Sequence, residues 1–132
     1  MDSLLIWTWN CNGYGNKRAR LQQFLRSRHR KPDVILMQET VIECVTLPGY
    51  VAYRAQGGPP GRVRGVCTFV RRKWPVLVHC LDGDENVERI AVEVLVGRVG
   101  VCVCTIYSNP HFRRQRFSNT LHGAVTGQTG EA

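Results

Sequence analysis

Two apolar runs near the amino end of the chain each stop abruptly at a polar side chain. Leu4–Trp9 is followed by Asn10, and Val34–Met37 is followed closely by Glu39. Continuous apolar runs of this length are typical of buried strands in a parallel sheet. Between them, Arg18–Arg30 has apolar residues at helical spacing and is predicted to be the crossover helix. We therefore expect Asn10 and Glu39 to lie side by side at the carboxyl ends of neighbouring strands.

Five more strands are predicted from apolar runs separated by Gly, Pro and Asp. They cover Tyr50–Arg54, Val63–Val70, Val76–Leu81, Val87–Val96 and Val99–Tyr107. The second and third of these are expected to pair with each other through the short turn at residues 72–75. The last, Val99–Tyr107, is apolar on both faces, so it is expected to be a central strand. A helix is predicted to begin at Asn109-Pro110, because Asn is a good cap and Pro a good first residue.

Length and composition predict one soluble domain. The 132 residues are 43% apolar and contain no apolar stretch long enough to span a membrane. The amino end lacks the pattern of a secretory signal. We assign residues 1–124 to the domain, and the polar, Gly-rich residues 125–132 are predicted to be a disordered tail.

The six cysteines show no Cys-x-x-Cys spacing, which favours free thiols over a zinc site or disulfides. Cys102 and Cys104 alternate along one strand and are expected to face the same side. Free thiols indicate a reducing compartment, so the expected location is nuclear or cytoplasmic and not secreted.

The chain is basic, with a net charge of +8 from 18 basic and 10 acidic residues. The cations gather in three groups, at residues 17–31, 62–73 and 113–116. Such groups favour contact with the phosphates of a nucleic acid, although a solvated helix face and ordinary turn residues would also explain them. No segment resembles a motif that reads base sequence.

Three motifs in order along the chain carry a family resemblance. Trp9-Asn10-Cys11-Asn12-Gly13, Pro32–Thr40 and Cys104–Pro110 resemble the endonuclease/exonuclease/phosphatase superfamily. The resemblance is greatest to the apurinic-type endonuclease domain of non-LTR retrotransposon proteins, and it runs from about Leu4 to Leu121. It implies a metal-dependent phosphodiester hydrolase that acts on DNA, with Mg²⁺ or Mn²⁺ and no small-molecule cofactor. The residue sequences of the motifs and the net positive charge disfavour a phosphatase-type member of the superfamily.

The resemblance implies a role for three residues. Glu39 corresponds to the metal-binding glutamate, which suits Mg²⁺ because hard cations prefer oxygen ligands. Asn10 corresponds to an asparagine beside the metal that orients catalytic groups, and Tyr107 to a tyrosine near the scissile phosphate. Ordinary structural roles remain open for each: a capping glutamate, a turn asparagine and a half-buried aromatic at a strand end.

The family's later Gly-Asp-Phe-Asn and Ser-Asp-His motifs do not occur in this sequence. The resemblance therefore implies a partial four-layer α/β sandwich, with one mixed sheet, a crossover helix, a C-terminal helix and no second sheet. One apolar sheet face would then be exposed. We expect a truncated retroelement endonuclease domain with little or no activity as this chain alone. A non-catalytic remnant and a small basic nucleic-acid-binding protein are the alternatives, and the sequence gives no oligomeric state.

Overall fold

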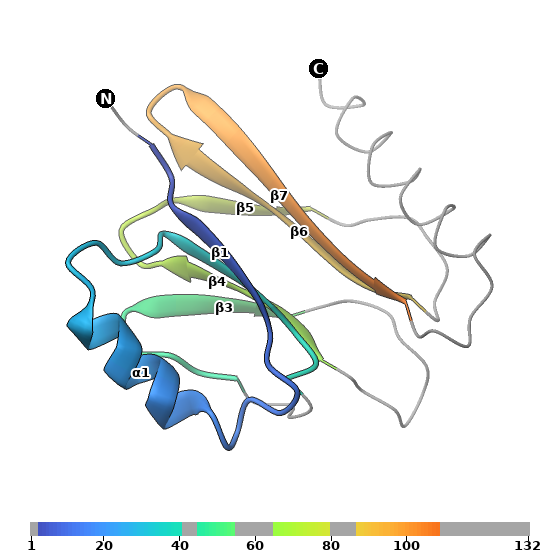
Figure 1. Cartoon of the computed structure of the whole chain (residues 1–132). Coiled ribbons are helices and arrows are strands. Elements are labelled where there is room, and N and C mark those ends of the chain that lie inside the picture. Colours follow the sequence, from blue (N-terminus) through green and yellow to red (C-terminus); the bar gives the residue numbers. More distant parts are fainter. Residues whose placement is uncertain (1–2, 41–44, 55–64, 80–86, 109–132) are drawn as a thin grey trace.

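The computed structural model describes residues 3–40, 45–54, 65–79 and 87–108. Its elements are β1 (Ile6–Asn10), α1 (Arg18–Ser27), β2 (Val34–Gln38), β3 (Tyr50–Arg54), β4 (Val66–Arg71), β5 (Val76–His79), β6 (Val87–Val96) and β7 (Val99–Ser108). They form three layers, with α1 on one face of a four-stranded sheet and a three-stranded sheet on the other face (Figure 1). The predicted α/β class is confirmed.

The four-stranded sheet has the order β1-β2-β4-β3. β1 and β2 are parallel, with Asn10 in register with Gln38, and the other pairs are antiparallel. α1 joins the two parallel strands, which confirms the predicted crossover. The helix ends at Ser27, earlier than predicted, because the backbone of Arg28 is already extended (φ −87°, ψ 133°).

The three-stranded sheet has the order β5-β6-β7 and is antiparallel throughout. The prediction of a single mixed sheet with the second sheet missing is therefore wrong. The predicted pairing of β5 with β4 is also wrong, because β4 already has β2 and β3 as its neighbours. The chain instead turns after Arg71, whose carbonyl accepts a hydrogen bond from the Trp74 N–H (3.0 Å), and β5 enters the other sheet beside β6.

β7 pairs with β6 alone in the described part of the chain, so the prediction of a central strand is wrong there. Its two apolar faces have another cause. Val101 and Val103 pack into the core between the sheets, whereas Cys104 and Ile106 pack with Ala91 on the outer face. Layering, and not a second neighbouring strand, explains the apolar pattern.

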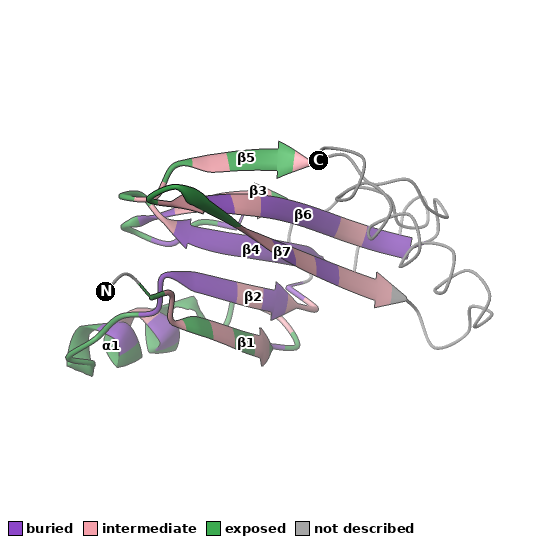
Figure 2. Ribbon diagram, turned by 90° about the horizontal axis from the view of Figure 1, so that it is seen from above, coloured by how far each residue is buried: buried purple, intermediate pink, exposed green. Residues whose placement is uncertain are grey.

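The sheet alternation divides the apolar residues into two cores. Ile35, Met37 and Phe69 point toward α1, whereas Val34 and Val70 point toward the three-stranded sheet. Figure 2 shows the result: β2, β4 and β6 are mostly buried, and exposed residues lie on β1 and β5. The expected exposed sheet face is thus covered over β2 and β4, and it stays open mainly along β1.

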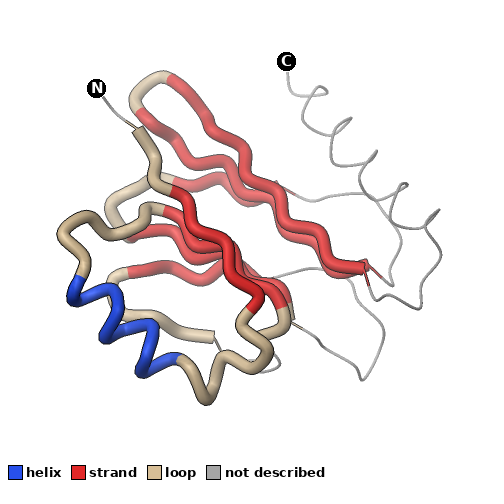
Figure 3. Tube along the Cα trace, viewed as in Figure 1, coloured by secondary structure: helices blue, strands red, loops and turns tan. Residues whose placement is uncertain are grey.

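Four of the six cysteines lie in the described residues and form no disulfide with one another: Cys11 and Cys67 are buried, and Cys102 and Cys104 are half-buried. Cys44 and Cys80 lie outside those residues, as do the helix predicted from Asn109 and the tail at 125–132. The single helix of the described chain is clear in Figure 3. It has ten residues, and the described chain contains no helix with the length and hydropathy that spanning a membrane requires.

Candidate active site

The residues singled out from the sequence gather at one end of the two sheets. β1, β2 and β7 all run toward this end (Figure 1). Asn10 is the last residue of β1, Glu39 follows β2 directly, and Tyr107 is the penultimate residue of β7. The neighbouring positions expected for Asn10 and Glu39 are confirmed by the parallel register, which the Cys11 N–H extends by donating to the Gln38 carbonyl at 3.1 Å.

Glu39 and Tyr107 contact each other across the two sheets. The Tyr107 hydroxyl donates a hydrogen bond to Glu39 Oε1 at 3.1 Å, although the two residues are 68 positions apart in the sequence. Both side chains are half-buried. A hydrogen bond to a carboxylate is stronger than one between neutral groups, so this contact fixes the direction of the Glu39 carboxylate.

The backbone of Glu39 is held in an unusual conformation. Its φ of +57° lies in the left-handed region, which non-glycine residues rarely adopt. The Glu39 carbonyl accepts the Gly13 N–H at 2.7 Å, and the next residue, Thr40, donates its N–H to the Gly65 carbonyl at 3.1 Å. Strained residues persist where the surroundings over-determine them, and they cluster at functional sites. Because of this left-handed backbone, the Glu39 side chain leaves the chain in a different direction from the one it would have if β2 continued through Glu39.

Asn10 lies beside this pair without joining it. Its side chain is exposed, and in the described chain it makes no hydrogen bond to Glu39. The structure thus brings Glu39 and Tyr107 into contact and leaves the Asn10 amide accessible at the neighbouring strand end. An accessible amide oxygen at this position can still serve a ligand that binds between the two strands.

The donor set at this end suits a hard cation. Oxygen atoms at this end of the strands include the Glu39 carboxylate and the side-chain amides of Asn10 and Gln38, which are paired in register at the ends of β1 and β2. Mg²⁺ typically takes one or two carboxylates and completes its shell with water and phosphate oxygens. The described residues contain no group of three or more His, Cys, Asp and Glu that could enclose a metal, which argues against a closed zinc-type cage there.

The nearby Cys11 thiol adds no ligand to this set. Burial raises the pKa of Cys11 above its ordinary value, and hydrogen bonds from the Gly13 and Cys11 backbone and the charge of Lys17 only partly oppose this. Metals bind the thiolate form of cysteine, so a protonated and buried thiol is a poor ligand. The described groups that could serve a metal at this end are therefore oxygens.

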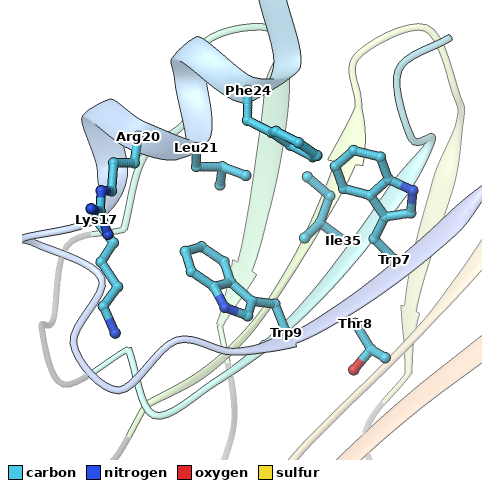
Figure 4. Close-up of a pocket in the computed structure, with 8 residues that line it drawn as sticks. All are labelled: Trp7, Thr8, Trp9, Lys17, Arg20, Leu21, Phe24 and Ile35. Atoms are coloured by element: carbon cyan, nitrogen blue, oxygen red, sulfur yellow. The ribbon is translucent and has the colours of Figure 1, made fainter. Parts of the chain in front are cut away.

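A hollow of about 580 Å³ lies away from Glu39, between α1 and the edge strand β1. Figure 4 shows the rings of Trp7 and Trp9 directed toward the helix, where Leu21 and Phe24 meet them, while Thr8 points away. The rings of Trp7 and Phe24 are 5.5 Å apart. The lining is mainly aromatic and aliphatic and includes the cations Lys17 and Arg20 but no carboxylate, so the hollow does not share the chemistry of the Glu39 end.

A basic hollow of about 370 Å³ lies at the opposite end of β2. Its lining includes four cations, Arg30, Lys31, Arg71 and Lys73. The single acid in this lining, Asp33, is buried. Its carboxylate already accepts hydrogen bonds from the Leu5 N–H and the Trp74 indole N–H, both at 2.9 Å. The fold thus brings members of the first two basic groups together, a juxtaposition that sequence spacing did not indicate.

Sequence reasoning also missed Glu88, a carboxylate that is only 4% exposed. It lies on β6 on the same face as Ile90 and Val92, which pack between the sheets. The signal was present in the alternation of that strand, because every second residue from Glu88 onward faces the core.

The model of the endonuclease/exonuclease/phosphatase family matches residues 7–129 of the chain. No curated protein matches it.

Proposed function

Because the chain belongs to the endonuclease/exonuclease/phosphatase family, we propose that Glu39, Asn10 and Tyr107 form part of a divalent-metal-dependent phosphodiester hydrolase site. The hydrogen bond of 3.1 Å between Tyr107 and Glu39 is the observation that carries this proposal. It brings two residues chosen from distant motifs to one point at the rim of the two sheets. A rim position gives a bound phosphate access from solvent.

Each residue has a distinct task in this proposal. Glu39 would hold Mg²⁺ or Mn²⁺, and the Asn10 amide oxygen would lie beside the ion or orient its water. The ion supplies neutralisation of the phosphate charge and polarisation of the phosphorus–oxygen bond. The single Tyr107 hydroxyl proton would hold the Glu39 carboxylate in the free site and would turn to a phosphate oxygen once substrate has bound.

DNA is the substrate class that we propose, in a domain of the non-LTR retrotransposon type. The residue sequences of the Trp9–Gly13 and Leu36–Thr40 motifs and the net charge of +8 favour DNA over an inositol phosphate. The reaction would nick one strand and leave a 3′-hydroxyl. We expect little hydrolysis by this chain alone, because groups that act as a unit lose their rate enhancement when members are missing.

Mn²⁺ binding tests the site independently of turnover. Electron paramagnetic resonance of free Mn²⁺ should show that the 132-residue chain binds the ion. Glu39→Gln should weaken binding about 10-fold or more, because it removes the only charged ligand proposed. Glu93→Gln is the matched control, since Glu93 lies on the outer face of β6 in a 2.9 Å pair with His79. No binding by the wild type, or equal binding by Glu39→Gln, would overturn the proposal.

The basic hollow around Asp33 favours a second candidate, nucleic-acid binding without hydrolysis. Cations that neutralise phosphates release counterions, so binding should fall steeply as salt rises. DNA affinity that is equal with and without Mg²⁺, unchanged in Glu39→Gln and reduced in the double variant Lys31→Ala/Lys73→Ala would favour this candidate. A filter-binding titration at several salt concentrations separates the two functions.

A further inference from the structure

We propose that Glu88 is a positioning residue that holds the Glu39 end of the site in place through the backbone of Gly65. The inference rests on the proposed function. Glu88 lies near the start of β6, on the face between the sheets, and is 4% exposed. Its Oε1 accepts the Gly65 N–H at 3.1 Å, in a bond that is itself buried.

Gly65 is linked to Glu39 through a hydrogen bond with Thr40, the residue that follows Glu39. Its carbonyl accepts the Thr40 N–H at 3.1 Å, and Thr40 is only 1% exposed. Gly65 has a φ of +83°, a conformation that glycine adopts without a side-chain penalty. Both polar groups of Gly65 are therefore engaged, one by Glu88 and the other by the residue that follows Glu39. Releasing the Gly65 N–H would loosen the anchor that fixes the left-handed turn at Glu39.

Glu88 also flanks the other partner of the site. It is directly opposite Tyr107 in the β6–β7 register, and residues opposite each other in an antiparallel pair share a face. Tyr107 in turn donates to Glu39. Glu88 thus stands next to both segments that meet in the Glu39–Tyr107 hydrogen bond, although it belongs to neither motif.

Burying a carboxylate at this position is energetically unfavourable. The next residues on the same face are Ile90, Val92 and Val94, all buried and apolar. Burying a charge costs more than burying an aliphatic side chain of similar size, and replacing buried ionic groups by apolar ones is often stabilising. An apolar side chain could fill this position, but it could not accept the Gly65 N–H, which Glu88 does at 3.1 Å.

Three variants of the full chain test the inference. Glu88→Gln keeps an oxygen acceptor for the Gly65 N–H and removes the charge. Glu88→Leu fills the same space and removes the acceptor. Glu93→Leu makes the same change on the outer face of β6 and is the control. Mn²⁺ affinity and hydrogen exchange of the Gly65 and Thr40 amides are measured for each variant.

We expect Glu88→Leu to bind Mn²⁺ about 10-fold more weakly and to exchange the Gly65 and Thr40 amides faster, because positioning partners of ligands typically have effects of this size. Glu88→Gln and the control should match the wild type in both readouts. A Glu88→Leu variant with wild-type affinity and slow exchange would overturn the inference. So would a Glu88→Gln variant as defective as Glu39→Gln, since the charge itself would then be the ligand. If Glu88→Leu does not fold, hydrogen exchange in the wild type decides: a Gly65 amide as protected as the Thr40 amide supports the inference, and a Gly65 amide that exchanges freely overturns it.

Failure of the proposed function has a different signature. A wild type that binds no Mn²⁺ removes the metal site altogether. The exchange rates of the Gly65 and Thr40 amides in Glu88→Leu still report on whether the anchor exists. Metal binding without any effect of Glu88→Leu removes the positioning role and leaves the proposed function standing.

Discussion

Glu39→Gly is expected to abolish Mn²⁺ binding and to have a free energy of unfolding about 0.5–1 kcal/mol higher than that of Glu39→Ala, which loses the same carboxylate and the same hydrogen bond from Tyr107. The two effects have separate causes. Glycine removes the carboxylate, and it also adopts the φ of +57° at this position without a clash. The left-handed conformation costs other residues about 1–2 kcal/mol, and the extra backbone entropy that glycine loses on folding reduces the gain. Urea unfolding followed by tryptophan fluorescence, with a Mn²⁺ titration, measures both effects.

Two controls separate the strain from the charge. Glu39→Ala removes the carboxylate and keeps the strain, so it should lose Mn²⁺ and gain no stability. Asn12→Gly changes the other left-handed non-glycine residue in the described chain, at φ +47°, and should keep Mn²⁺ binding. A Glu39→Gly protein no more stable than Glu39→Ala would show that the turn is not strained, because both variants lose the hydrogen bond from Tyr107.

Phe69→Ala is expected to lower the free energy of unfolding by about 3–5 kcal/mol, the usual cost of removing a buried aromatic ring. Phe69 lies on β4 beneath α1 and is 0% exposed. Its ring centroid is 5.8 Å from that of Tyr14 and 6.4 Å from that of Tyr50, so the substitution also breaks two aromatic contacts. Since domains have only about 5–15 kcal/mol to lose, a large part of the population would unfold at moderate urea concentrations.

Phe24→Ala makes the same chemical change at a ring that is 44% exposed. Phe24 contacts Trp7 and the Arg28 guanidinium at the surface of α1. Its loss should cost about 1 kcal/mol, as is typical of partly exposed sites. Equal losses for the two variants, measured by urea unfolding, would contradict the assignment of Phe69 to the centre of the core.

The local hydrophobic pattern was sufficient to predict the described helix and strands and the parallel pairing of β1 with β2. The runs that form β1 and β2 and the helix between them could be predicted because each is a periodic segment with a clear end. The partner of β5 could not be predicted in the same way. A hairpin with β4 fits the short turn at residues 72–75, but β4 has no free edge because β2 pairs with one side of it and β3 with the other. Such long-range competition leaves no mark in a local window.

The candidate site likewise has features that could be predicted from the sequence and features that could not. The adjacency of Asn10 and Glu39 follows from two parallel strands ending together. The family resemblance implied that Tyr107 and Glu39 belong to one site, but it did not indicate their hydrogen bond, which depends on how one sheet lies over the other. Glu88 carries no motif at all, and only the alternation of β6 could have indicated that its side chain is buried.

The long separation between Tyr107 and Glu39 also concerns the order of folding. Closing a loop of 68 residues costs more chain entropy than forming the hairpins, and contacts of high sequence separation slow folding. β6 and β7 are joined by a tight turn and can pair early, as can the strands of the other sheet once α1 has formed. The hydroxyl of Tyr107 reaches Glu39 only after the sheets have docked. A probe on Tyr107 would therefore report the last step in building the site, and during synthesis that step must wait until β7 has left the ribosome.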